Sequence, residues 1–181
     1  MTNPAITIVP IDDTDIRIIR HIARSLEQAF QITTSIKSWE TIFQNLPIPI
    51  YDRYHSTIIL KYVCENRPED ANKILIVTEL DLFSPIFSCL FGEAQLNGTC
   101  SLFSLFRLRQ EFYNLKTDQK ILLSRCAKEA IHEVAHTLGM RHCYDKNCIM
   151  FPSMNIIDTD SKSTSFCVNC LRLFSERRHK Y

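Results

Sequence analysis

The sequence predicts one α/β domain, bordering on α+β, with a mixed, twisted sheet and a long helix in its second half. Three observations support this class. The hydrophobic pattern of residues 6–78 follows the order strand, helix, strand, helix, strand, which implies right-handed crossovers and a partly parallel sheet. A helical pattern then extends from about residue 118. The chain has 181 residues, 45% hydrophobic and 23% charged, which suits a globular domain with a core.

The first three elements follow from hydrophobic spacing. Residues 6–9 form a short apolar run that Pro10 ends, and they predict a strand. Asp12 or Asp13 is expected to cap a helix over about 14–30, where apolar residues recur every three or four positions. The β-branched run that follows, at 31–37, predicts a second strand.

The next unit is less uniform. Residues 45–50 contain two prolines and predict an extended loop. The apolar run at 56–63 is ambiguous between helix and strand, and by analogy with the first unit we expect a helix over about 52–64. The stretch K-I-L-I-V-T at 73–78 is the strongest strand pattern in the chain.

A hairpin is predicted after this strand. A short apolar run at 87–91 ends at Gly92, Asn97 and Gly98 form a hairpin-type turn, and residues 100–108 return as a strand. One of these two strands should be a sheet edge. Its role is open at this point between an ordinary buried edge and a surface that binds an extended ligand.

The second half of the chain is mainly helical. Asp118 is a plausible cap for a long helix that ends near Leu138. Its charged residues Arg125, Lys128 and Glu129 are expected on a solvated face, with contacts to the sheet or to groups around the metal as the alternative. Residues 158–165 are polar and predict a loop, and residues 167–178 predict a helix at the end of the domain.

A histidine cluster lies at the end of the long helix, in the pattern His132-Glu133-x-x-His136-x-x-Gly139-x-x-His142. Histidines four apart share one helix face and can bind one zinc ion, and Glu133 suits a general base beside it. Gly139 lets the backbone leave the helix and return His142 as a third ligand. Three ligands leave one position open, as in catalytic zinc sites. The alternative is an amphipathic helix with surface or core histidines.

Two close pairs of cysteines follow the histidines: Cys143, Cys148, Cys167 and Cys170. The spacing C-x4-C and C-x2-C predicts a closed, tetrahedral zinc site of structural type, with two disulfides as the alternative. Apolar neighbours predict buried free thiols for the other four cysteines: Cys64, Cys89, Cys100 and Cys126.

The complete string, H-E-x-x-H-x-x-G-x-x-H-C-x4-C-x-M and then C-x2-C, resembles the archaemetzincin family of zinc peptidases. This motif covers residues 130–170. Shorter similarities lie upstream: Tyr51-Asp52, Asp81-Leu82-Phe83, Phe91-Gly92-Glu93-Ala94 and Arg107-Leu108. The chain departs from the family at Val134-Ala135, where a Leu-Gly pair is frequent, but these positions should not touch the metal.

The resemblance implies a compact, metzincin-like zinc-peptidase domain over 1–181. Residues 1–142 would form a subdomain with the sheet and the active-site helix, and residues 143–181 a short subdomain with the structural zinc. Met150 would be the Met-turn residue, a hydrophobic floor and not a ligand, with a plain core methionine as the alternative. Asp158 or Asp160 could accept a proton from a zinc-bound histidine, or could be solvated loop carboxylates.

The resemblance also implies that an edge strand above the zinc pairs with an extended substrate. We expect this strand at 87–94. Its substrate-binding candidates are Phe91, Gly92, Glu93 and Ala94.

The sequence therefore favours zinc-dependent hydrolysis of peptide bonds, with Glu133 as the base and two zinc ions per chain, one catalytic and one structural. The substrate would be a peptide or protein. A catalytically silent peptide-binding zinc module is the main alternative, although it would not need Glu133. A nucleic-acid-binding zinc ribbon is disfavoured by the formal net charge of +1.

The remaining expectations concern location and assembly. No apolar run approaches 18 residues and the start of the chain has no signal-peptide pattern, so we expect no membrane contact. Eight cysteines without such a signal predict a reducing, cytoplasmic location. We expect a monomer.

Overall fold

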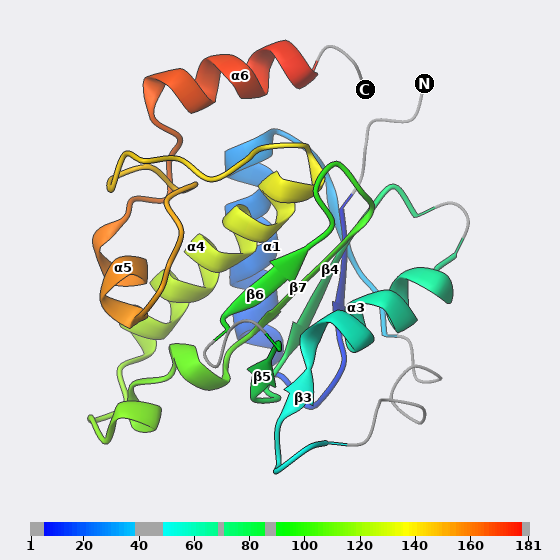
Figure 1. Cartoon of the computed structure of the whole chain (residues 1–181), viewed down its shortest axis with the longest axis vertical. Helices are drawn as coiled ribbons and strands as arrows, with labels where there is room; N and C mark the ends of the chain where they lie inside the picture. The colour runs from blue at the N-terminus through cyan, green and yellow to red at the C-terminus, as the bar shows by residue number, and fades with distance from the viewer. Residues whose placement is uncertain (1–5, 39–48, 69–70, 86–89, 179–181) are drawn as a thin grey trace.

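The structure is a computed structural model, and it describes residues 6–38, 49–68, 71–85 and 90–178. A central sheet is covered on one face by α1 (Ile16–Phe30) and α4 (Gln119–Thr137) and on the other by α3 (Ser56–Glu65) (Figure 1). The predicted 87–89 and 45–48 segments and Cys89 lie outside the described residues. The α/β class and the mixed sheet are confirmed.

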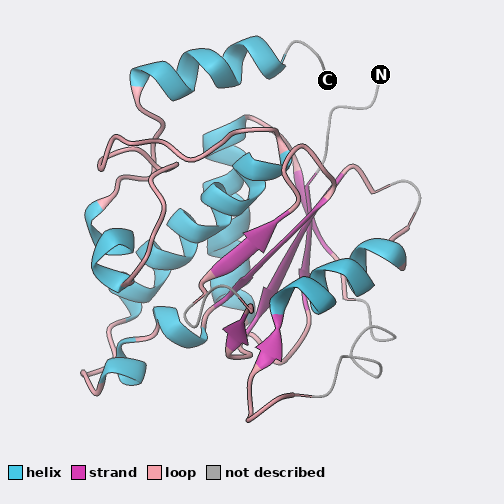
Figure 2. Cartoon of the chain, in the orientation of Figure 1, coloured by secondary structure: helices cyan, strands magenta, loops and turns pink. Residues whose placement is uncertain are grey.

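The main sheet has five strands in the order β2-β1-β4-β7-β6 (Figure 2). Four of them run parallel: β1 (Ile6–Pro10), β2 (Thr34–Ile36), β4 (Lys73–Thr78) and β7 (Cys100–Ser104). The fifth, β6 (Gly92–Ala94), is antiparallel to β7 and forms an edge. A separate two-stranded parallel sheet joins β3 (Tyr54–His55) to β5 (Leu82–Phe83).

The central strand β4 shows why the sheet needs cover on both faces. Leu75 and Val77 belong to the core under α1 and α4, whereas Ile74 and Ile76 belong to the core under α3. All four side chains are fully buried. A continuous apolar run is what a parallel strand buried on both faces requires.

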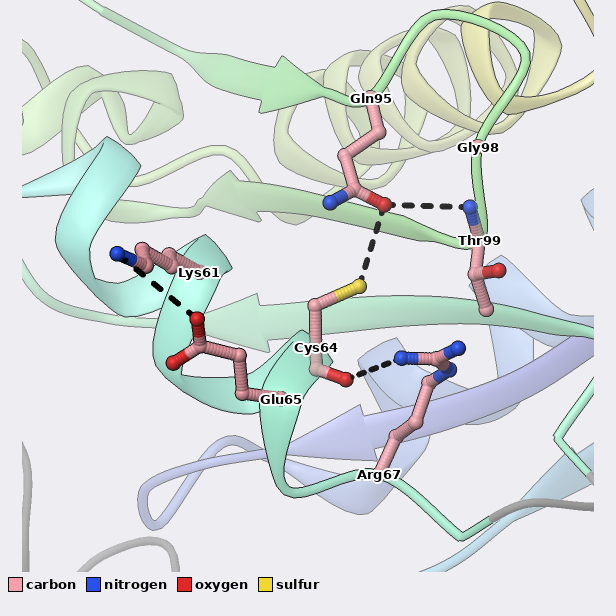
Figure 3. Close-up of a pocket in the computed structure, with 7 residues that line it drawn as sticks. All are labelled: Lys61, Cys64, Glu65, Arg67, Gln95, Gly98 and Thr99. Atoms are coloured by element: carbon pink, nitrogen blue, oxygen red, sulfur yellow. Dashed lines mark hydrogen bonds and ion pairs between the residues drawn. The ribbon is translucent and has the colours of Figure 1, made fainter.

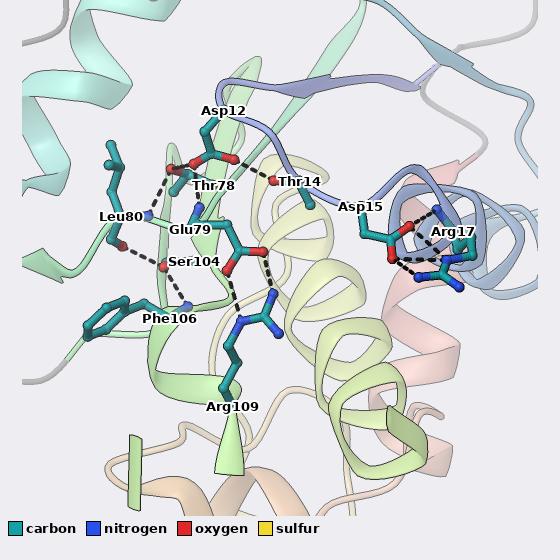
Figure 4. Close-up of polar contacts among 10 residues, drawn as sticks. All are labelled: Asp12, Thr14, Asp15, Arg17, Thr78, Glu79, Leu80, Ser104, Phe106 and Arg109. Carbon is teal, nitrogen blue, oxygen red and sulfur yellow. Dashed lines mark hydrogen bonds and ion pairs between the residues drawn. The ribbon is translucent and has the colours of Figure 1, made fainter. Parts of the chain in front are cut away.

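The remaining helical segments lie before and after α4 in the sequence. Two short 3₁₀ turns, Phe106–Leu108 and Gln110–Tyr113, lead into α4, and α5 (Ile156–Ser161) and α6 (Val168–Arg178) close the chain. The strand expected over 100–108 ends at Ser104 because its hydroxyl accepts the amide of Phe106 and turns the chain (Figure 4). The prediction of a loop over 158–165 is wrong for residues 158–161, which belong to α5. A capping box formed by Asn155 and Asp158 begins this helix.

Two aspartates near β1 have different roles from those predicted. The cap of α1 is Asp15, which accepts the amide of Arg17 at 2.8 Å, so the prediction of Asp12 or Asp13 is wrong. Asp12 instead accepts the hydroxyl of Thr78 at 2.7 Å and joins the ends of β1 and β4 (Figure 4). Asp118 is confirmed as the cap of α4 and accepts two backbone amides.

Cys64 and Cys100 form a disulfide between the end of α3 and the start of β7, with Cα atoms 5.9 Å apart. The prediction of free thiols is therefore wrong for this pair, and the cysteine count is a weaker argument for a reducing compartment. Gln95 lies beside the bridge and accepts the amides of Thr99 and Cys100, in a small pocket of about 310 Å³ (Figure 3). Cys126 is a buried free cysteine, as expected.

Candidate functional site

Three histidines meet at the C-terminal end of α4. His132 and His136 lie one helical turn apart on α4, and His142 returns to them after the helix ends. The ligand atoms of all three lie within 4.8 Å of one another. The structure thus brings together the three residues whose spacing predicted a metal site.

Backbone carbonyls fix the orientation of two of these rings. His132 Nδ1 lies 2.8 Å from the carbonyl oxygen of Ile149, and His136 Nδ1 lies 2.7 Å from that of Met140. Since a carbonyl only accepts, both Nδ1 atoms must carry the proton. The alternative in which Asp158 or Asp160 orients one of these two rings is wrong, because Asp158 accepts backbone amides at the start of α5 and Asp160 binds Arg125.

The tautomers leave a lone pair on Nε2 of both rings, and these two atoms face each other at 3.1 Å. Two lone pairs at this distance repel each other unless a cation lies between them. Two nitrogens bound to one tetrahedral zinc are about 3.4 Å apart, so the donor set fits a zinc ion.

Loss of hydration favours the neutral form of all three imidazoles, although His142 is the most exposed of them. This loss lowers the pKa of His132 well below 6.5, that of His136 to about 4, and that of His142 below its usual value. The positive charge of Lys162 adds to each effect. Neutral imidazole is the form that binds a metal.

Two features of the turn after α4 require glycine at position 139. Its φ of +82° is a left-handed conformation that side-chain-bearing residues rarely adopt. A Cβ at this position would also collide with the guanidinium of Arg177 in α6 and approach Asn97 Oδ1 at 3.3 Å. The turn that returns His142 is therefore packed between the β6–β7 hairpin and the C-terminal helix.

The carboxylate of Glu133 lies between the histidine cluster and the edge strand. Its side chain is 5% exposed, and a Cβ added to Gly92 would lie 2.6 Å from its Oε1. Burial raises the pKa of Glu133 well above its usual value, and the charges of Glu129 and Glu93 raise it further. Gly92 thus makes room for a carboxylate that the helix holds away from bulk water.

A cleft of about 890 Å³ opens over this group. It contains the three histidines, Glu133 and all four residues predicted to bind substrate. Five of its other eleven lining residues are apolar, and they come from the segments before β6, after β6 and after Met150: Pro85, Leu90, Leu96, Pro152 and Met154.

The edge strand β6 leaves backbone groups directed away from the sheet. Phe91 accepts the amide of Ser104 at 2.8 Å, and Gln95 donates to Cys100 at 3.0 Å, so both residues bond toward β7. Because the direction alternates along an antiparallel strand, the N–H and C=O groups of Gly92 and Ala94 face the other way. Glu93 anchors the strand, since its carboxylate accepts the hydroxyls of Ser56 and Thr57.

Met150 lies between Cys148 and Cys167 in the sequence, directly after the residue whose carbonyl contacts His132. Its side chain is fully buried. Its carbonyl accepts the amide of Cys143 at 2.8 Å, and the preceding carbonyl, of Ile149, orients His132.

The four cysteines predicted as a second site also come together. Their sulfur atoms lie within 4.8 Å of one another, and all four are free of disulfides. The sulfurs of Cys143 and Cys167 are 3.8 Å apart. Two thiolates bound to one tetrahedral zinc have about this separation, so this donor set fits zinc as well.

Comparison with known proteins agrees with this geometry. Residues 67–176, more than half of the chain, match the model of peptidase family M54. The archaemetzincin of Methanocaldococcus jannaschii is 36% identical over 95% of this chain and 93% of its own.

The chain belongs to peptidase family M54, the archaemetzincins. Membership in M54 makes it a zinc metallopeptidase. A second archaemetzincin, from Pyrococcus furiosus, is 34% identical over 95% of this chain and 93% of its own. The crystal structure of a zinc-dependent peptidase from Methanocorpusculum labreanum superposes with a TM-score of 0.82 at 25% identity and covers 93% of this chain and 99% of that one.

In this M54 chain, α4 also carries charged residues whose environment the sequence did not reveal. Arg125, Lys128 and Glu129 are 4%, 8% and 2% exposed, so the prediction of a solvated face is wrong. Arg125 forms two hydrogen bonds of 2.7 Å with Asp160. Lys128 donates to backbone carbonyls of α5, and Glu129 pairs with Lys162 at 3.1 Å. These contacts dock α5 onto α4 beside the active-site cleft.

Replacing Lys162 by Met should lower the free energy of unfolding by about 3–5 kcal/mol, because Glu129 would remain buried without its counter-charge. Both side chains are at most 3% exposed. Urea unfolding followed by circular dichroism measures this change. The double variant Glu129→Leu/Lys162→Met should regain most of the loss, and equal losses in both variants would contradict the argument.

Among the described residues, none of the helices has the length and apolar character that crossing a membrane requires.

Proposed function

We propose that this chain hydrolyses peptide bonds in extended segments that lie along β6, with a catalytic zinc held by His132, His136 and His142. One observation carries the proposal. The buried carboxylate of Glu133, the three histidine nitrogens and the outward-facing backbone groups of Gly92 and Ala94 all border the same cleft.

Zinc, when bound, supplies a Lewis acid that polarises the scissile carbonyl and lowers the pKa of the attacking water. Glu133 then performs the proton transfers. Its carboxylate accepts a proton from the water during attack and delivers it to the leaving amine. Its packing against Gly92 restricts where that proton is held.

The edge strand would position the substrate. A peptide segment added beside β6 would bond to the backbone groups of Gly92 and Ala94, which gives binding with little dependence on sequence. The apolar walls of the cleft then favour hydrophobic side chains on either side of the scissile bond. The substrate would thus be a peptide or an unfolded stretch of a protein.

A second, structural zinc would be held by Cys143, Cys148, Cys167 and Cys170. It would tie the segment after His142 to the start of α6, and its binding would contribute directly to the folding free energy of the part from 143 onward. Met150 would act as the hydrophobic floor of the histidine site and not as a ligand.

Metal removal and restoration test this proposal. The protein as purified without oxygen should hold two zinc ions per chain by elemental analysis, and should cleave members of a mixed peptide library. A chelator should remove activity, and added zinc should restore it. Two zinc ions with no cleavage of any peptide would favour the catalytically silent binding module. A parent protein with a single zinc ion that survives replacement of both His132 and His136 would hold only the thiolate site, and the proposal would fail.

Replacing Gly92 by Ala should lower kcat by about 100-fold with a smaller change in KM. The added methyl group would displace the Glu133 carboxylate, and a shift of about 1 Å in a catalytic group has this order of effect. Steady-state kinetics on a cleaved library peptide measure it. Ala94→Gly is the matched control on the same edge. An unaltered kcat in Gly92→Ala would show that the added methyl group does not displace the Glu133 carboxylate.

A further inference from the structure

The cleft contains one strong positive charge without a counter-charge. Arg141 is the only Lys or Arg among the described residues that line it. The side chain is exposed and forms no ion pair within the described part of the chain.

Within the described part of the chain, the acidic residues of the cleft form no ion pair with Arg141, and each has other contacts. Glu129 pairs with Lys162, and Glu93 accepts two hydroxyls from the start of α3. Glu133 is buried behind Gly92. A guanidinium that lines the cleft without an ion-pair partner among the described residues therefore favours a ligand that brings its own carboxylate.

The backbone fixes where Arg141 lies. The carbonyl of the preceding residue, Met140, accepts the Nδ1 proton of His136, and the following residue is His142. The Gly139 turn contacts Asn97, whose amide donates to the carbonyl of His136 at 2.9 Å. Arg141 therefore lies at the end of the cleft that is next to the β6–β7 turn.

The direction of β6 places this end relative to a bound peptide. The strand and α4 lie side by side and run the same way, since Gly92 contacts Glu133 and Asn97 contacts His136 (Figure 1). Antiparallel pairing is the more stable kind, and it would put the N-terminal part of a substrate at the end where β6 finishes. That is the end where Arg141 lies.

We propose that Arg141 selects peptides with an acidic side chain on the N-terminal side of the scissile bond. This inference rests on the proposed function, because the scissile bond defines the N-terminal side. Recognition of the acidic side chain is itself a binding property and can be measured without cleavage. A partly exposed carboxylate–guanidinium pair gives about a two- to fivefold preference. The preference should shrink at about 1 M salt, where charges are screened within about 3 Å.

The test uses pairs of library-derived peptides that differ only in Glu or Gln at one position, with cleavage sites located by mass spectrometry. For the zinc-loaded protein, kcat/KM should be about two- to fivefold higher for Glu at a position before the scissile bond. Arg141→Gln should bring this ratio close to one, and Arg141→Glu should invert it. Arg24→Gln, on the exposed face of α1, changes the net charge equally and should keep the ratio.

Binding of the same pairs to a Glu133→Gln protein separates the two proposals. A Glu preference in binding that Arg141→Gln removes supports the inference even if no peptide is cleaved, in which case the proposed function fails. Cleavage with no Glu preference, or with a preference that survives in Arg141→Gln, overturns the inference and leaves the peptidase intact. A preference that lies only after the scissile bond also overturns it.

Discussion

Replacing Glu133 by Gln should lower kcat by a factor of about 10² to 10⁴ while both metal sites keep their zinc. General acid–base catalysis contributes an effect of this size, and an amide cannot accept the proton of the attacking water. Glu133 is not one of the three residues whose ligand atoms cluster, so the metal content should not depend on it. The change is nearly isosteric, so the packing against Gly92 should be kept.

The measurement is kcat for one cleaved peptide beside zinc content and thermal unfolding. Glu133→Asp is the informative control, because it keeps a carboxylate but retracts it from the cleft, and it should retain part of the activity. A Glu133→Gln protein with full zinc and undiminished kcat would show that another group takes the proton. Loss of zinc along with activity would instead make the carboxylate part of the metal site.

The histidine site could be predicted because its information is local. His132 and His136 share a helix face by spacing alone, and Gly139 marks the turn that returns the third residue. The strand at 73–78 was equally predictable, because β4 is buried on both faces and its sequence is a continuous apolar run. The groups that orient the histidines could not be predicted from the sequence, because they are backbone carbonyls, which any residue could supply.

The environment of Glu129 depends on contacts distant in sequence. A charged residue in a helical pattern normally faces solvent. It is buried here because Lys162, far along the chain, supplies the counter-charge once α5 has docked. The Cys64–Cys100 bridge has the same origin, since only the packing of α3 against β7 brings the two residues together. Spacing does not encode such pairs.

Replacing Cys167 and Cys170 together by Ser should remove the second zinc, lower the free energy of unfolding by several kcal/mol and weaken zinc binding at the histidines. Structural zinc contributes on the order of 10 kcal/mol to folding in isolated zinc-finger peptides, so the loss should be large. These two cysteines stand at the start of α6, the helix whose Phe174 packs against Phe30 of α1 with ring centroids 5.6 Å apart.

The effect on the histidine site follows from the connections between the two clusters. Cys143 directly follows His142, and its amide is held by the carbonyl of Met150. Arg177 of α6 fills the space over Gly139, where the chain turns toward His142. A loosened α6 would thus release the third ligand from both directions, although His132 and His136 stay on α4.

Competition with a calibrated zinc chelator, beside total zinc and urea unfolding, separates these effects. Cys126→Ser is the matched control, because Cys126 is a fully buried free cysteine outside the cluster. That variant should lose some stability from the buried hydroxyl but keep two zinc ions and the chelator competition of the parent protein. If Cys167→Ser/Cys170→Ser loses one zinc but keeps the parent affinity at the histidines, the two sites are independent, and α4 with its turn holds His142 without help from α6.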